Sequence, residues 1–342
     1  MGEVSISLWD LHLISGLPVY GSFYIEVIPN SKDISSLPSC CRHLFVAFHH
    51  LSLKLGGSHL VTTAACVKFW FRSESNYQNP PTRRSIQRKA RGKQSHNPSG
   101  KIDAPRILTK EDEAPFNVLK VERRLIEETW LAALILCWLC EFALPDEGLN
   151  LIRPGVFKSA SAMARGKRYC LAVAVLANIY RGLNEIVSSK TPSKCDATFL
   201  AHYLNAWLAE YFDTHFELEG SRSKVVPRMF RYSGEGAAKH YDKVTARKLF
   251  RAMSSFKFHH LGLFKGHQEI LVDDDKLPNS YADYFINQCS NYLASRRGSI
   301  CIVELYSPHR FGQQFSFNQH IPGEFNEDFR TITLEQVVCF WC

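Results

Sequence analysis

The segment from Leu151 to Ile186 constrains the fold of this chain more than any other stretch of its sequence. Pro154 suits the first turn of a helix, where a missing N–H is tolerated, and Gly166 interrupts the helical spacing that follows. The segment contains no recognisable nucleophile, general base or cofactor-binding loop. It predicts two amphipathic helices, whose apolar stripes are Val156, Phe157, Ala160, Met163 and Ala164, and then Ala172, Val175, Leu176, Ile179, Leu183 and Ile186.

Helical patterns also cover much of the remaining chain. Leu125–Leu144 is hydrophobic nearly all round, which predicts a helix in the centre of a bundle that ends at Pro145. The chain has 342 residues, 45% of them hydrophobic, which is enough for a sizeable core. We therefore predict a mainly α protein, with a helical bundle-like globular core and a few short β-strands. Further helices are expected at 41–52, 197–216 and 235–255, and strands at 299–305 and, from partial alternation, at 311–319.

Composition divides the chain into three parts. Large apolar residues almost vanish after Ser73, where Pro80-Pro81 and a basic run are followed by Asn97-Pro98. Such a stretch cannot bury enough apolar surface to fold alone. We expect an N-terminal part at 1–75, a basic flexible linker at 76–115 and a helical core at 116–342.

The net charge of +8 is concentrated in the linker. Between Thr82 and Arg106 there are eight basic residues and one acidic residue, whereas the rest of the chain is nearly balanced. A basic run of this kind is typical of nuclear-import signals and of sequence-independent contacts to phosphates. The alternative is a loop that only improves solubility. The residues predicted to make these contacts are Arg83, Arg84, Arg88, Lys89, Arg91 and Lys93.

A second basic pattern lies in the helix expected at 235–255. Its cations recur every four residues, so they fall on one slowly turning side of the helix and form a candidate nucleic-acid-binding face. The alternative is an ordinary solvated face. The residues are Lys239, Lys243, Arg247 and Arg251.

Other motifs favour structural explanations. Arg231–Lys239 does not match a phosphate-binding loop and predicts a glycine-rich turn into a helix. Asp273–Asp275 predicts an acidic loop, because adjacent aspartates point in different directions. The pairs Cys137/Cys140 and Cys339/Cys342 enclose bulky apolar residues and lie about 200 residues apart, so we expect core cysteines rather than a zinc site. No metal, cofactor or catalytic residue is predicted.

Several long blocks resemble the plant mobile domain in its transposon-associated branch. They include IRPGVFKSASAMARGKRYCLAVAVLANIYRGLNEI, HYLNAWLAEYFDTHF, MFRYSGEGAAKHYDKVTARKLFR and YSPHRFGQQFSFNQHIPG, together with SISLWDLHLISGLPVYGSFYIEVIP near the start. The family is also labelled aminotransferase-like, which implies a pyridoxal phosphate lysine that no local motif here supports. Relatives continue beyond the position of Cys342, so a C-terminally truncated copy is expected.

The resemblance implies a nuclear protein similar to the maintenance-of-meristems proteins, with roles in transposon silencing, transcriptional regulation and meristem maintenance. The implied partners are nuclear proteins, among them a phosphoprotein phosphatase-like relative, with DNA as a further candidate. No membrane contact is expected, because the longest apolar run, Trp130–Leu144, is too short to span a bilayer. We therefore expect a non-enzymatic interaction module. The alternative is an accessory or decayed mobile-element enzyme that acts on nucleic acid with a divalent metal.

Overall fold

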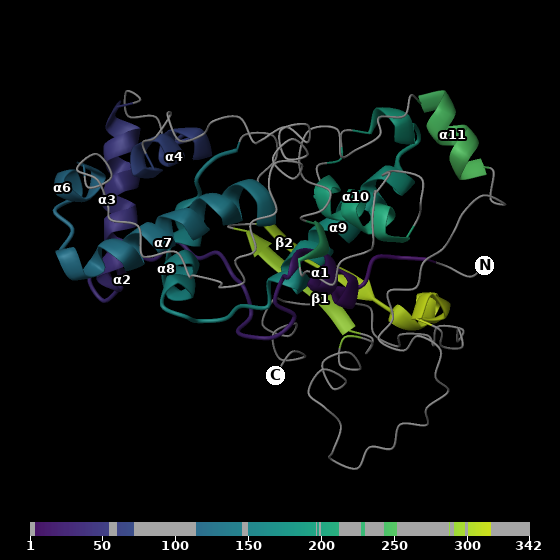
Figure 1. The fold of residues 1–342 in the computed structure, drawn as a ribbon, viewed down its shortest axis with the longest axis horizontal. Coiled ribbons are helices and arrows are strands. Elements are labelled where there is room, and N and C mark those ends of the chain that lie inside the picture. Colours follow the sequence, from purple (N-terminus) through teal and green to yellow (C-terminus); the bar gives the residue numbers. More distant parts are fainter. Residues whose placement is uncertain are drawn as a thin grey trace, which may run out of the picture. The chain divides into compact units, whose positions relative to one another are not determined.

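The computed structural model describes residues 4–54, 60–71, 114–145, 150–195, 197, 200–211, 227–229, 243–251, 287, 291–297 and 300–315. Helices dominate these residues, and the strands form a two-stranded antiparallel sheet, which confirms the predicted mainly α class (Figure 1). The chain divides into two compact units. Unit 1 comprises Met1–Ile25, Arg168–Ser233 and Ala237–Cys342, and unit 2 comprises Glu26–Lys167 and Gly234–Gly236. No described helix is both long and apolar enough to cross a membrane.

The described helices of unit 2 are α2 (Ser31–Ile34), α3 (Ser39–Lys54), α4 (Thr63–Phe71), α6 (Ala114–Leu119), α7 (Ile126–Trp138) and α8 (Phe157–Ala164). They gather around α7 (Figure 1). Contacts join α7 to α3, α4 and α8, and Phe157 of α8 meets Phe45 and Phe48 of α3 edge-on, at ring distances of 4.7 and 5.8 Å. The helix predicted at 41–52 is confirmed by α3.

The apolar pattern of Leu125–Leu144 produces a helix with one buried and one exposed side. Ala132, Ala133 and Leu136 are buried, whereas Leu131 and Leu134 are 44% and 53% exposed. The last turn, Leu139–Ala143, is a π-helix that ends before Pro145. The prediction of a central helix is therefore confirmed for the side that contacts α3, α4 and α8, and is wrong for the opposite side.

The segment Leu151–Ile186 forms two helices, as predicted. A 3₁₀ turn at Pro154–Val156 leads into α8, and Gly166 follows that helix with a φ of 88°, in the left-handed region that favours glycine. The second helix is α9 (Leu171–Ser188), which belongs to unit 1. The break at Gly166 therefore lies close to the point where the chain passes from unit 2 to unit 1.

Unit 1 packs α9 against the sheet. Contacts join α9 to α1 (Leu8–Ser15), to β1 (Asn291–Arg297) and to β2 (Ile300–Tyr306). The two strands pair antiparallel, from Asn291 opposite Tyr306 to Arg297 opposite Ile300. Asn178 of α9 donates to the Ser295 hydroxyl of β1 at 3.2 Å. Unit 1 also contains α10 (Ala201–Tyr211) and α11 (Lys243–Arg251).

The strand prediction at 299–305 is confirmed by β2, but the one at 311–319 is wrong for its described part. Residues Pro308–Phe315 form a 3₁₀ segment. Pro308 provides no backbone N–H for a strand, and Phe311 and Gln314, three residues apart, are both buried. Two 3₁₀ pieces meet in this segment at a kink at Phe311, whose φ and ψ are −120° and 27°.

Candidate functional site

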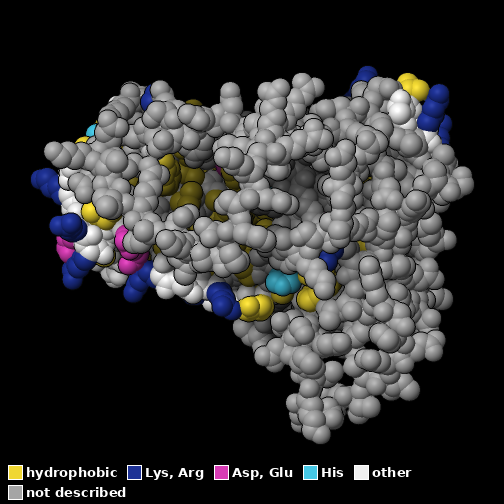
Figure 2. Space-filling view, viewed as in Figure 1, with side chains coloured by type: hydrophobic (Ala, Val, Ile, Leu, Met, Phe, Trp, Pro, Cys, Tyr) yellow, Lys and Arg dark blue, Asp and Glu magenta, His cyan; other side chains and the backbone are white. Residues whose placement is uncertain are grey.

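The described part of the predicted nucleic-acid-binding face lies on α11. Lys243, Arg247 and Arg251 are four residues apart in one continuous helix, so their backbone positions form a row along one side. Arg247, Arg251 and the neighbouring Lys248 are exposed. Figure 2 shows Lys and Arg side chains at the place that α11 occupies in Figure 1. We call Lys243, Arg247, Lys248 and Arg251 the α11 basic face.

The electrostatics of the α11 basic face favour an anionic partner. The helix contains no acidic residue, and none of the ion pairs among the described residues involves Arg247, Lys248 or Arg251. Like charges four residues apart destabilise a helix by about 0.2–0.5 kcal/mol a pair. A polyanion relieves this repulsion, and backbone phosphates are bound in this way without regard to base sequence.

Several predicted site residues lie outside the residues that the structure describes. They include Lys239 of the candidate face and all six cations of the linker, Arg83, Arg84, Arg88, Lys89, Arg91 and Lys93. The glycine-rich turn at 231–239, the aspartates at 273–275 and the cysteines at 339 and 342 also lie outside them.

The cysteine pair at 137 and 140 is buried in unit 2. Burial raises the pKa of Cys140 to about 12. Hydrogen bonding to Cys137, followed by burial, raises the pKa of the neighbouring Cys66 well above its ordinary value. The nucleophile and metal ligand is the thiolate rather than the thiol, so Cys66 and Cys140 are held in the unreactive form. Among the described residues no group of three or more His, Cys, Asp or Glu side chains could hold a metal ion.

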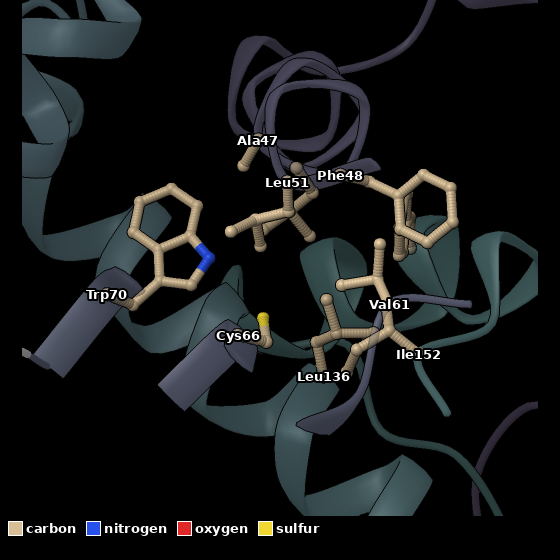
Figure 3. A pocket seen from close by; sticks show the side chains of 10 residues that line it. Ala47, Phe48, Leu51, Val61, Cys66, Trp70, Leu136 and Ile152 are labelled. Atoms are coloured by element: carbon tan, nitrogen blue, oxygen red, sulfur yellow. The ribbon is translucent and has the colours of Figure 1, made fainter. Parts of the chain in front are cut away.

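Cys66 also borders a small apolar cavity in unit 2 (Figure 3). Its volume is about 10 Å³, close to that of a single water probe. Figure 3 shows Leu136, Val61 and Ile152 around the same space, with Trp70 beside it. This cavity has no room for a metabolite and is lined mainly by apolar side chains, so it is a packing defect of the core.

A buried polar cluster in unit 1 surrounds Asp10, which is completely buried. Ser7 and Asp10 form a reciprocal capping box at the start of α1. The Asp10 carboxylate also accepts a hydrogen bond from the Tyr211 hydroxyl at 2.6 Å and one from the Gln314 side-chain amide at 3.1 Å. Burial raises the pKa of Asp10 from 3.8 to about 6, although the hydrogen bonds from Tyr211 and Ser7 lower it. The carboxyl group is therefore not exposed to solvent.

Two further tyrosines tie the N-terminus into the same cluster. The Tyr180 hydroxyl donates to the Ile6 carbonyl at 2.9 Å and lies 3.1 Å from the Ser5 hydroxyl. The Leu8 N–H donates to the Tyr306 hydroxyl at 3.2 Å. Because α9 and β2 contribute these tyrosines, residues 5–8 are held by elements far away in sequence.

Asp10 was not among the site residues predicted from the sequence. A local signal was present, because Ser7-Leu8-Trp9-Asp10 has the spacing of a capping box in front of an apolar run. That spacing predicts a helix start, and it carries no information about Tyr211 or Gln314. The burial of the carboxyl group depends on these distant contacts.

Comparison with known proteins gives a family. No curated protein and no solved structure matches the chain. A family model described as Plant mobile domain matches residues 1–341, which is almost the whole length of both units. The chain therefore belongs to the plant mobile domain family.

Proposed function

We propose that this chain is a non-enzymatic nuclear interaction module of transposon origin. It contributes to transcriptional regulation, transposon silencing or meristem maintenance through protein partners and DNA. Membership of the plant mobile domain family supports this proposal. The partners we expect are nuclear proteins, including a phosphoprotein phosphatase-like relative.

The α11 basic face carries the DNA part of the proposal. Arg247, Lys248 and Arg251 are exposed, and no described acidic side chain neutralises any of the three. Contacts from such a row are to backbone phosphates, so binding has little sequence preference and falls steeply with salt.

A salt titration of duplex DNA binding tests the DNA part. Replacement of Lys243, Arg247 and Arg251 by Ala removes about three phosphate contacts. The slope of log affinity against log salt concentration should then become shallower by about 3. The matched control replaces Arg124, Arg165 and Arg181, which are already paired with Glu122, Glu128 and Glu185 at 2.7, 3.8 and 2.9 Å. That control should keep the original slope. A full-length protein that retains no DNA at low salt would overturn the DNA part of the proposal.

A fluorescent fusion tests the nuclear part. Replacement of the six linker cations, Arg83, Arg84, Arg88, Lys89, Arg91 and Lys93, by Ala should abolish nuclear enrichment. The control replaces six exposed cations outside the linker and α11, namely Lys32, Arg42, Lys68, Lys120, Lys158 and Lys190. Unchanged localisation of the linker variant, or equal loss in the control, contradicts the import assignment.

A further inference from the structure

The Asp10 carboxyl group joins three parts of unit 1 that are far apart in sequence. Its Oδ2 atom accepts hydrogen bonds from the Ser7 N–H at 2.9 Å, the Ser7 hydroxyl at 2.8 Å and the Gln314 amide at 3.1 Å. Its Oδ1 atom contacts the Tyr211 hydroxyl at 2.6 Å. Gln314 also accepts a hydrogen bond from the Ser5 N–H at 3.1 Å. The N-terminal segment is thus bound to the last residue of α10 and to the 3₁₀ segment Pro308–Phe315 through one carboxyl group.

No described cation forms an ion pair with this buried carboxyl group. The titratable groups around it are the hydroxyls of Tyr211 on α10, Tyr180 on α9 and Tyr306 on β2. α10 also carries Glu210, which pairs with Arg228 at 3.4 Å, and the Pro308–Phe315 segment carries Arg310, whose charge acts on Tyr180. Burial raises the pKa of Tyr180 and of Tyr306, so both hydroxyls stay protonated over the range in which Asp10 titrates. A charge on Asp10 is therefore offset only by hydrogen bonds.

The hydrogen-bond geometry accommodates a proton on Asp10. A hydroxyl both donates and accepts, so the contact between Oδ1 and Tyr211 persists when the proton lies on Oδ1. Oδ2 is then a carbonyl oxygen with two lone pairs, which the Gln314 amide and the two donors of Ser7 share. Protonation consequently removes a desolvated charge from the core while the contacts between the three elements remain.

We propose that Asp10 is a pH-sensitive latch, which holds the N-terminal segment Ser5–Ser15 on α10 and on Pro308–Phe315 more firmly when its carboxyl group is protonated than when it is ionised. The direction follows from linkage. Folding raises the pKa of this carboxyl group from 3.8 to about 6. Such a group contributes its full stabilisation of the folded state at pH values below the pKa of the unfolded chain. That stabilisation is lost as the pH rises through the pKa of the folded state. When the pH rises from about 5 to about 7.5, the equilibrium constant for docking of the N-terminal segment should fall on the order of tenfold.

Hydrogen exchange of the full chain, followed by mass spectrometry at these two pH values, tests the latch. After correction for intrinsic exchange rates, peptides from the N-terminal segment and from α10 should lose protection at the higher pH by on the order of tenfold. Peptides from α3 and α8 of unit 2 provide an internal reference. Asp10→Asn should remove the pH dependence in unit 1. The control Asp33→Asn, at an exposed first-turn acid of α2, should retain it.

A second variant keeps the proposal testable if Asp10→Asn fails to fold. Tyr211→Phe preserves the carboxyl group and deletes a donor that favours its ionised form. The midpoint of the protection change should therefore move to higher pH. Equal protection of the wild-type peptides at both pH values overturns the proposal. The proposal is also overturned if the protection of unit 1 peptides still depends on pH in Asp10→Asn. The same holds if Tyr211→Phe leaves the midpoint of the protection change where it was.

Discussion

At the scale of single residues, Glu26 and Arg153 form a bidentate ion pair in unit 2 that is almost wholly removed from water. The Arg153 guanidinium donates to the two carboxylate oxygens at 2.8 and 2.7 Å, and also to the Leu144 carbonyl at 2.7 Å. The Arg153 side chain is 14% exposed and the Glu26 side chain is 2% exposed. Gly155 passes so close that an added Cβ would lie 3.2 Å from the Glu26 Cβ. The pair fixes the start of unit 2 to the turn that precedes α8.

Removal of one partner from this pair should be costly. Glu26→Ala leaves a buried guanidinium without its counter-charge, and we expect a loss of roughly 3–5 kcal/mol in the free energy of unfolding. Urea denaturation followed by circular dichroism measures it. The control is Glu122→Ala, which breaks an ion pair with Arg124 whose side chains are 61% and 80% exposed. That change should leave the denaturation midpoint unaltered. Equal effects of the two substitutions would contradict the assignment.

At the scale of the element, α7 shows how an evenly apolar helix becomes two-sided. Its buried side meets α3, α4 and α8, and Trp130 lies 5.9 Å from the Phe71 ring of α4 and 6.5 Å from the Phe116 ring of α6. Leu131 and Leu134 have the same side-chain type as the buried Leu136, and yet they are exposed. The residue type alone does not show which of these leucines is buried, because burial depends on the helices that pack against each position.

A matched pair of leucines on α7 tests this division. Leu136 is 1% exposed and Leu134 is 53% exposed, while both belong to the same helix. Leu136→Ala should lower the free energy of unfolding by about 2–5 kcal/mol, through lost burial and the cavity left behind. Leu134→Ala should have little effect, because the side chain is already half in water and Ala favours helix. Thermal denaturation of both variants checks this, and similar losses would refute the two-sided description of α7.

At the scale of the whole molecule, both units bury thiols. Cys40, Cys41, Cys66, Cys137 and Cys140 lie in unit 2 and Cys170 lies in unit 1, all of them buried. Burial raises the pKa of Cys40 to about 12, and it does the same for Cys170. In contrast, Cys301 on β2 is exposed.

This contrast predicts a labelling order. In native protein a thiol-alkylating reagent near neutral pH should modify Cys301 before the buried cysteines of the described residues, because a buried thiol is out of reach of the reagent. Cys40, Cys66, Cys140 and Cys170 should react only after denaturation. Peptide mass spectrometry at successive times measures the order. Early modification of Cys140, before Cys301, would contradict the burial of unit 2 described above.

Much of the helical structure was predictable, because helical hydrogen bonds are local. The starts of α3 and α8 follow from Pro38 and Pro154, and the break after α8 follows from Gly166. The strand β1 was not predicted. Its residues Tyr292, Leu293, Ala294 and Ser295 are all buried, so it lacks the alternation of a half-exposed strand. Its hydrogen-bond partners come from β2.

The sequence by itself determined the helical class, the membership of the plant mobile domain family and the four-residue spacing of the α11 basic face. Each of these three properties depends on residues that are close together in sequence, or on the order of residues along the chain. Only the tertiary structure decided which side of α7 is buried and that Asp10 meets Tyr211 and Gln314, 201 and 304 residues away. The physical reason is that burial and desolvation depend on neighbours brought together by folding, and no local pattern specifies them.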